Sequence, residues 1–165
     1  MLPLLASFEN AGVDFLVVHS RTVEQKYKGK ANHEMTREIV ESTRLPVIAN
    51  GDIVNKQGAA HVLALTGAAG LMLGRGAIAD PKLFQRIRGQ AYDLAEGKRY
   101  QKELEAHVRA LLVVYSDLFC GDAQVLSKLK ETLVHIKHPD VFRWAKKLVK
   151  QRTLSDLRVM LGEAA

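Results

Sequence analysis

Cysteine is nearly absent from this chain. The 165 residues contain one cysteine, Cys120, so no internal disulfide can form. A single cysteine is typical of proteins from a reducing compartment. Also missing are an apolar run near the roughly 20 residues that a membrane span needs and a basic, signal-like N-terminal segment. These absences predict a soluble, cytoplasmic protein with no membrane partner.

The composition is that of a globular, basic chain. Hydrophobic residues make up 47% of the sequence, and its length suits one ordinary domain or two small ones. The net charge is +6 and the pI is about 9.5. Such a charge favours phosphate-bearing partners such as RNA, nucleotides or membrane surfaces. Lysine and arginine are dense after residue 90 and include Lys128, Lys130, Arg143 and Lys146.

The first 89 residues alternate between strand and helix patterns. Apolar runs predict strands at 13–19, 46–50 and 69–73, and helical spacing predicts helices at 2–11, 32–43 and 55–66. A further helix is expected to begin at Asp80 and Pro81, with the aspartate as N-cap and the proline at the first helical position. This alternation predicts parallel strands joined by crossover helices. Three strands are too few for a closed barrel, which has eight.

After residue 89 no further strand is expected. Helical spacing recurs at 100–119, 123–136, 139–150 and 153–161, with breaks at Gly121-Asp122 and His138-Pro139. We therefore predict two domains, an α/β part over 1–89 and a basic helical bundle over 90–165, with the boundary between 89 and 97.

Two glycine-containing turns follow neighbouring predicted strands. Asn50, Gly51 and Asp52 follow one strand, and Gly74, Arg75 and Gly76 follow the next. Glycine lets backbone N–H groups approach an anion, and arginine adds a forked positive charge. Either turn alone is better explained as an ordinary βα connection. The pair, at this spacing, favours a phosphate cradle at the carboxyl ends of the strands.

Other reactive side chains each have a second explanation. His19 ends a predicted strand and can donate to a bound phosphate, or it is a structural residue of the rim. The other histidines lack metal-ligand spacing, so no metal site is predicted. Cys120 has no assignable base and is expected to be a packed or incidental thiol. Trp144 can stack on a nucleobase, although packing in the helical core is the favoured interpretation.

Three segments resemble a known family. Residues 16–22 (LVVHSRT), 46–53 (PVIANGDI) and 71–77 (LMLGRGA) are similar to the C-terminal half of the catalytic barrel of the tRNA-dihydrouridine synthases. The helical tail resembles that family's RNA-binding domain, and the chain looks most like the bacterial branch that acts on the tRNA D-loop. The resemblance implies an α/β fold: a partial (β/α)₈ TIM barrel, containing its last three strands, followed by a C-terminal helical bundle.

The resemblance also implies a chemistry. Members of this family bind FMN, which is reduced by NADPH and then passes a hydride to a uridine of tRNA, while a cysteine donates a proton. The positions that match the FMN-binding residues of the family are His19, Asn50, Gly51, Asp52, Gly74 and Arg75. We expect tRNA contacts from Arg21, Lys128, Lys130, Arg143 and Lys146.

The sequence also departs from the family pattern in ways that bear on activity. Ser20 stands where the family usually has glycine, and the asparagine-rich motif with the catalytic cysteine is absent, so no catalytic residue is assigned. We therefore expect part of such an enzyme, inactive alone, that associates with a missing N-terminal half or with itself. Two alternatives stay open: a tRNA-binding module without catalysis, and another phosphate-binding TIM-barrel enzyme such as a sugar-phosphate isomerase or synthase.

Overall fold

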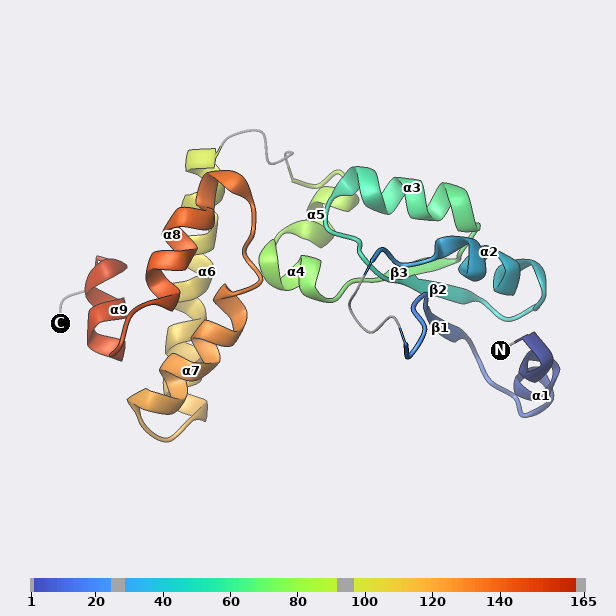
Figure 1. Cartoon of the computed structure of the whole chain (residues 1–165), viewed down its shortest axis with the longest axis horizontal. Helices are drawn as coiled ribbons and strands as arrows, with labels where there is room; N and C mark the ends of the chain where they lie inside the picture. Colours follow the sequence, from blue (N-terminus) through green and yellow to red (C-terminus); the bar gives the residue numbers. More distant parts are fainter. Residues whose placement is uncertain (1, 25–28, 92–96, 163–165) are drawn as a thin grey trace. The chain divides into compact units, whose positions relative to one another are not determined.

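The computed structural model describes residues 2–24, 29–91 and 97–162. Its elements, in chain order, are the 3-10 helix η1 (Leu2–Leu4), α1 (Leu5–Asn10), β1 (Leu16–His19), α2 (His33–Glu41), β2 (Val47–Asn50), α3 (Lys56–Thr66), β3 (Gly70–Met72), α4 (Arg75–Ala79), α5 (Leu83–Ile87), α6 (Gly97–Leu118), α7 (Asp122–Leu133), α8 (Pro139–Val149) and α9 (Leu154–Met160) (Figure 1).

The chain divides into two compact units. The sheet unit contains Met1–Gly76 and Gln85–Gln90, and the helical unit contains Ala77–Phe84 and Ala91–Ala165. The predicted domain boundary, between 89 and 97, overlaps residues 92–96, which lie outside the described residues. No helix in the described part of the chain is both long enough and apolar enough to cross a membrane.

The sheet unit contains a three-stranded parallel sheet in the order β1-β2-β3. This confirms the predicted α/β class and parallel pairing, and it is consistent with part of a TIM barrel. Strand β1 starts at Leu16, later than predicted. The reason is local: the Val13 N–H donates to the Phe8 carbonyl at the end of α1, and the first sheet bond joins the Leu16 N–H to the Pro46 carbonyl.

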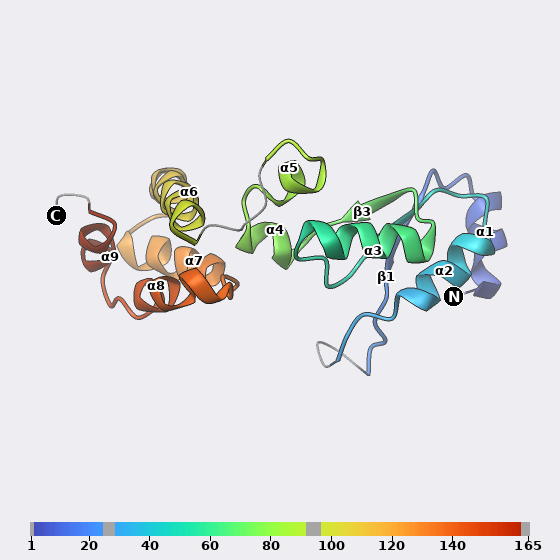
Figure 2. The same cartoon turned by 90° about the horizontal axis from the view of Figure 1, so that it is seen from above.

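One face of the sheet is covered by helices. Val18, Val47 and Ala49 point to this face and are at most 2% exposed. They belong to two hydrophobic clusters to which α2 contributes Ile39 and α3 contributes Ala59 and Val62. Figures 1 and 2 show α3 running alongside β3.

The opposite face of the sheet is uncovered in the part of the chain that the structure describes. We call it the open face; by strand register it is formed by Val17, His19, Ile48, Asn50, Gly70 and Met72. Val17 is 46% exposed and Met72 is 47% exposed, and neither belongs to a hydrophobic cluster. Alternate side chains of a strand point to opposite faces, so covering one face leaves the other exposed.

The helical unit has one hydrophobic cluster, to which α6, α7, α8 and α9 all contribute. Among its fully buried members are Leu104, Leu129, Leu148 and Leu157. Trp144 is half-buried and packs against this cluster, as the packing interpretation predicts. Helix α7 contacts α6, α8 and α9.

The helix predicted to begin at Asp80 starts later. Helix α5 begins at Leu83. Asp80 instead closes a turn, because its carboxylate accepts from the Lys82 N–H at 3.1 Å and its carbonyl accepts from the Leu83 N–H at 3.0 Å. The aspartate therefore caps an N–H group as predicted, although the helix itself begins later than expected, at Leu83.

Candidate functional site

Asp52 is the centre of a charged cluster at the carboxyl end of β2. Its two carboxylate oxygens accept hydrogen bonds from Nη2 of Arg21, at 2.8 and 2.7 Å. The Arg21 side chain is only 6% exposed, whereas that of Asp52 is 34% exposed. This ion pair joins residues 31 positions apart and ties the end of β1 to the turn after β2.

The turn after β3 joins the same cluster. Nη2 of Arg75 lies 3.6 Å from Oδ1 of Asp52, and the Arg75 side chain is 49% exposed. The two turns are in close contact, because an ideal Cβ built on Gly76 would lie 2.2 Å from the Ile53 carbonyl oxygen. Only glycine fits at position 76 without a backbone shift. The two turns that the sequence singled out are therefore neighbours in space.

The backbone of the Asn50–Asp52 turn is tightly constrained. Gly51 has a φ of +137°, and an ideal Cβ there would lie 2.7 Å from the Ala31 Cβ. Nε2 of His33 donates to the Gly51 carbonyl at 3.0 Å. Asp52 itself has a φ of +52°, an unusual value for a non-glycine residue. The Ala31 N–H donates to Oδ2 of Asp52 at 2.7 Å, which helps to hold this conformation.

The electrostatics keep Asp52 ionised. Partial burial alone would raise the pKa of its carboxyl group. The hydrogen bonds from Arg21 and from the Ala31 N–H, with the charges of Arg21 and Arg75, outweigh burial and lower the pKa below its ordinary value. An ionised carboxylate repels a phosphate, so Asp52 can position the arginines or accept from hydroxyl groups rather than bind the anion itself.

His19 and Asn50 lie on the open face, paired in register at the ends of β1 and β2. His19 is exposed, and Nδ2 of Asn50 donates to the Met72 sulfur at 3.5 Å. Gly74 is exposed, and a Cβ added there would meet no atom within 4 Å. Packing among the described residues therefore does not require a glycine at position 74.

Ser20, the departure from the family pattern, is fully buried. Its hydroxyl forms a short hydrogen bond with the hydroxyl of Thr36, which is also fully buried. The serine is thus accommodated without leaving its polar group unpaired.

The basic residues expected to contact tRNA are on different elements. Lys128 and Lys130 are on α7, and Arg143 and Lys146 are on α8. Nζ of Lys128 is 3.0 Å from Oε2 of Glu131, one turn away on the same helix. Arg143 and Lys146 are exposed, whereas Lys130 is half-buried. Arg21, the fifth residue expected to contact tRNA, belongs instead to the cluster around Asp52.

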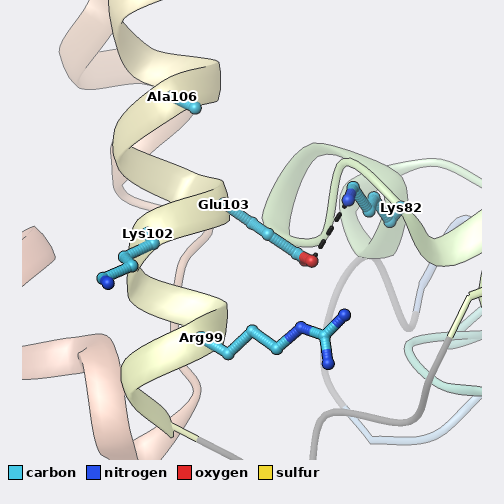
Figure 3. A pocket seen from close by; sticks show the side chains of 5 residues that line it. All are labelled: Lys82, Arg99, Lys102, Glu103 and Ala106. Atoms are coloured by element: carbon cyan, nitrogen blue, oxygen red, sulfur yellow. Dashed lines mark hydrogen bonds and ion pairs between the residues drawn. The ribbon is translucent and has the colours of Figure 1, made fainter.

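A hollow of about 360 Å³ opens in the helical unit, and no residue of the two strand-end turns lines it. It is lined by Lys82, Arg99, Lys102, Glu103 and Ala106. Figure 3 shows Glu103 reaching toward Lys82, whose Nζ lies 3.2 Å from its carboxylate. This carboxylate already satisfies one of the lining cations, so the hollow is a weaker anion site than its three basic residues suggest.

Two contributors to the strand-end cluster were not expected from the sequence. They are the Ala31 N–H and the His33 ring, which belong to no motif. Cys120 is exposed, just after α6. Within residues 2–24, 29–91 and 97–162, no group of three or more His, Cys, Asp or Glu side chains is arranged to hold a metal ion.

Comparison with known proteins gives a consistent family. The family model described as "Dihydrouridine synthase (Dus)" matches residues 2–158. The "tRNA-dihydrouridine synthase B" of Pseudomonas syringae pv. tomato is 36% identical over 115 residues, which are 67% of this chain and 34% of that protein. A "Probable tRNA-dihydrouridine synthase" of Rickettsia prowazekii is 44% identical over 97 residues, covering 58% of this chain and 29% of that protein. The chain thus matches about a third of the length of these curated relatives.

Proposed function

The chain belongs to the dihydrouridine synthase family, and on that premise we propose that it is part of an FMN-dependent tRNA-dihydrouridine synthase. Such an oxidoreductase reduces uridine in the D-loop of tRNA with electrons from NADPH. The sheet unit supplies the side of the flavin site that binds the FMN phosphate, as the last three strands of a TIM barrel. Helices α6–α9 supply the C-terminal, tRNA-binding bundle.

The observation that supports the flavin site is the cluster of Arg21, Asp52 and Arg75. It brings the turns after β2 and β3 together at the carboxyl ends of the strands, the position where barrel enzymes bind phosphates. Arg75 is half exposed and supplies the positive charge for the phosphate. Gly74, where an added Cβ would meet no atom within 4 Å, leaves room for backbone N–H contacts.

The remaining predicted residues have separate roles in this proposal. Asn50 and His19 are adjacent on the open face and can hydrogen-bond the flavin or its ribityl chain. Asp52 positions both arginines and can accept from ribityl hydroxyl groups. When bound, FMN supplies the hydride chemistry; the residues of this chain bind and orient it.

Under this proposal, the chain alone has no dihydrouridine synthase activity. Cys120 is exposed at the end of α6, in the helical unit and outside any charged or hydrogen-bonded cluster described for this chain, and no other thiol is present. The test is to incubate the purified chain with FMN, NADPH and a tRNA transcript that lacks dihydrouridine. We expect no dihydrouridine by mass spectrometry of the nucleosides, and its appearance would overturn the proposed inactivity.

The open face supports the proposal that the sheet unit associates with other polypeptide. Val17 and Met72 are exposed apolar residues of this face, and they lie on β1 and β3, the outer strands of the described sheet. An uncovered apolar face and unpaired strand edges favour association. The proposed partners are the remaining part of such a barrel, or a second copy of this chain when that part is absent.

For the helical unit we propose tRNA as the partner, which places the protein in the cytoplasm. Lys130, Arg143 and Lys146 are candidate contacts. Lys128 is expected to contribute less, because Glu131 already neutralises it. Arg21 is expected to act through Asp52, since its side chain is only 6% exposed.

The flavin proposal is tested by comparing FMN with riboflavin, which lacks the phosphate. Fluorescence titration should give tighter binding for FMN. Arg75→Gln should weaken FMN binding by roughly tenfold or more, the size of a charge-assisted hydrogen bond, and leave riboflavin binding unchanged. The matched control is Arg37→Gln, because Arg37 is an exposed arginine of the sheet unit that pairs with Glu41 on α2.

Equal affinity for FMN and riboflavin would contradict the proposed phosphate site. So would equal losses in the Arg75 and Arg37 variants. A tRNA-binding module without flavin chemistry is the second candidate. It is favoured by the separate core of α6–α9, and it predicts RNA binding with no flavin binding.

A further inference from the structure

Helix α8 has two faces of opposite character. Its inner face is apolar and contributes Val141, Ala145 and Leu148, at most 1% exposed, to the core. Its solvent face contains only cations and one aromatic residue between Val141 and Val149: Phe142, Arg143, Lys146 and Lys147 are all exposed. Lys150 and Arg152 continue the positive charge beyond the helix end.

The cations of this face are not neutralised. No acidic residue occurs between Asp140 and Asp156, a stretch that contains five lysines and arginines: Arg143, Lys146, Lys147, Lys150 and Arg152. Among the described residues, none of these five forms an ion pair. Lys128 on α7 differs, since Glu131 binds it, and so does Lys82 in the hollow, which Glu103 binds.

Phe142 adds an aromatic surface to this face. Its side chain is 43% exposed although α8 has a complete apolar face without it. Nζ of Lys146 lies 5.8 Å from the centroid of the Phe142 ring, a cation–π distance. Exposed aromatic rings among cations are the combination that proteins use to bind unpaired nucleobases and the backbone next to them.

We propose that the solvent face of α8 binds a single-stranded segment of RNA. Arg143, Lys146, Lys147 and Lys150 contact its phosphates, and one unpaired base stacks on Phe142. Trp144, the aromatic residue that the sequence first suggested for stacking, packs instead against the core. The inference deepens the proposed function, because it assigns the RNA partner to one helix face and to one class of RNA structure.

The electrostatic part is tested with the whole chain and a fluorescent, unmodified tRNA transcript over a series of salt concentrations. Lys147→Gln should weaken binding and reduce the slope of log K against log salt by about 0.7 to 1, the value expected for one phosphate contact. Lys102→Gln is the matched control, because Lys102 is an equally exposed lysine on α6 with no ion pair among the described residues. Equal effects of the two substitutions would overturn the assignment to α8.

The stacking part is tested with a single-stranded oligouridine and an RNA duplex of the same length. Phe142→Leu keeps an apolar side chain but removes the ring, so it should weaken oligouridine binding about tenfold, as expected for one stacked base. Its salt slope and its affinity for the duplex should stay unchanged. A loss that is equal for both RNAs would overturn the stacking role, and tighter binding of the duplex than of the oligouridine would overturn the single-strand preference.

Two further outcomes count against the proposal. One is that the chain does not bind RNA in low salt. The other is that it binds vesicles containing phosphatidylglycerol more tightly than RNA, with sensitivity to Phe142→Leu, which would make α8 a membrane-surface helix. The flavin titration involves no residue of α8, so failure here and failure of the proposed flavin site are distinguishable.

Discussion

The two units of this chain bury their hydrophobic residues to different extents. The helical unit closes one cluster among four helices, whereas the sheet unit has two smaller clusters on one face of its sheet and none on the other. The cause is geometric. An amphipathic helix has one apolar stripe to bury, whereas a sheet with apolar residues on both faces needs a packing partner on each face. We therefore expect the sheet unit, rather than the helical unit, to depend on further protein.

The charges of the two units are also organised differently. Arg21 and Arg75 share the single carboxylate of Asp52 in a compact cluster that is supported by a backbone N–H group. The cations of α8 lie side by side with no acidic partner among the described residues. The proposed FMN phosphate would match the first, compact arrangement, and the proposed RNA would match the second, extended one.

The largest expected effect compares buried and open positions. Leu129→Ala removes a fully buried side chain and should destabilise the helical unit by about 2–5 kcal/mol. Val17→Ala, on the open face and 46% exposed, should cost less than about 0.5 kcal/mol. Urea unfolding checks both: Trp144, the single tryptophan, reports the helical unit by fluorescence, and circular dichroism reports the whole chain. A cost of 2 kcal/mol or more for Val17→Ala would mean that the open face is covered.

The next effect separates the members of the charged cluster. Asp52→Asn removes the carboxylate charge that pairs with the nearly buried guanidinium of Arg21 and should cost about 1–3 kcal/mol. Arg75→Gln should cost less than about 0.5 kcal/mol, because Arg75 is half exposed and 3.6 Å from the carboxylate. Urea unfolding followed by circular dichroism measures both. The reverse order would show that Arg75, and not Arg21, is the structural partner of Asp52.

Helix caps should affect the two units about equally. The Asn55 side chain accepts from the Gly58 N–H at 2.7 Å, and the Thr153 hydroxyl accepts from the Asp156 N–H at 3.0 Å. Replacing either by alanine should cost about 1 kcal/mol. If the units unfold independently, only Thr153→Ala should shift the Trp144 fluorescence transition. A shift caused by Asn55→Ala would show that the units unfold together.

The smallest effect is a difference in pH dependence. Burial lowers the pKa of His107 on α6 below its ordinary value. The unfolded chain then binds a proton more readily, so the helical unit should lose stability as the pH falls below about 6.5. His107→Gln should flatten this dependence.

The pKa of Asp52 is also lowered, but here the pH dependence lies in a different range. The contribution of Asp52 to stability is fully present above the pKa of the unfolded chain, about 3.9, and is lost only as the pH falls below that value. Denaturant midpoints measured from pH 2 to pH 8 check both, and a sheet unit whose stability does not fall between pH 4 and pH 2 would contradict the assignment to Asp52.

Local features of the fold were predictable from the sequence. The helix predicted over 55–66 matches α3, and the runs around Ala49 and Leu71 were correctly identified as strands, because helical spacing and apolar runs act over a few residues. The start of β1 and the start of α5 were misplaced. In both places a backbone N–H group is satisfied by a turn instead of a strand or helix partner, and residue patterns do not encode that choice.

The site was partly predictable. The sequence singled out Asp52 and Arg75 by their place after two strands, and the structure brings them within 3.6 Å of each other. It could not indicate that the Ala31 N–H and the His33 ring support the same turn, since both come from a connection 18 or more residues away. Whether these residues bind FMN stays a prediction.

The sequence by itself determined the alternation of strands and helices, the family motifs at the strand ends and the concentration of positive charge between residues 143 and 152. Only the tertiary structure decided that Arg21 is paired with Asp52, that Phe142 is exposed while Trp144 packs, and that one face of the sheet is uncovered. The physical reason is the distance along the chain over which each property is set. Periodicity and motifs are properties of neighbouring residues, whereas pairing and burial depend on distances between residues that the folded chain brings together.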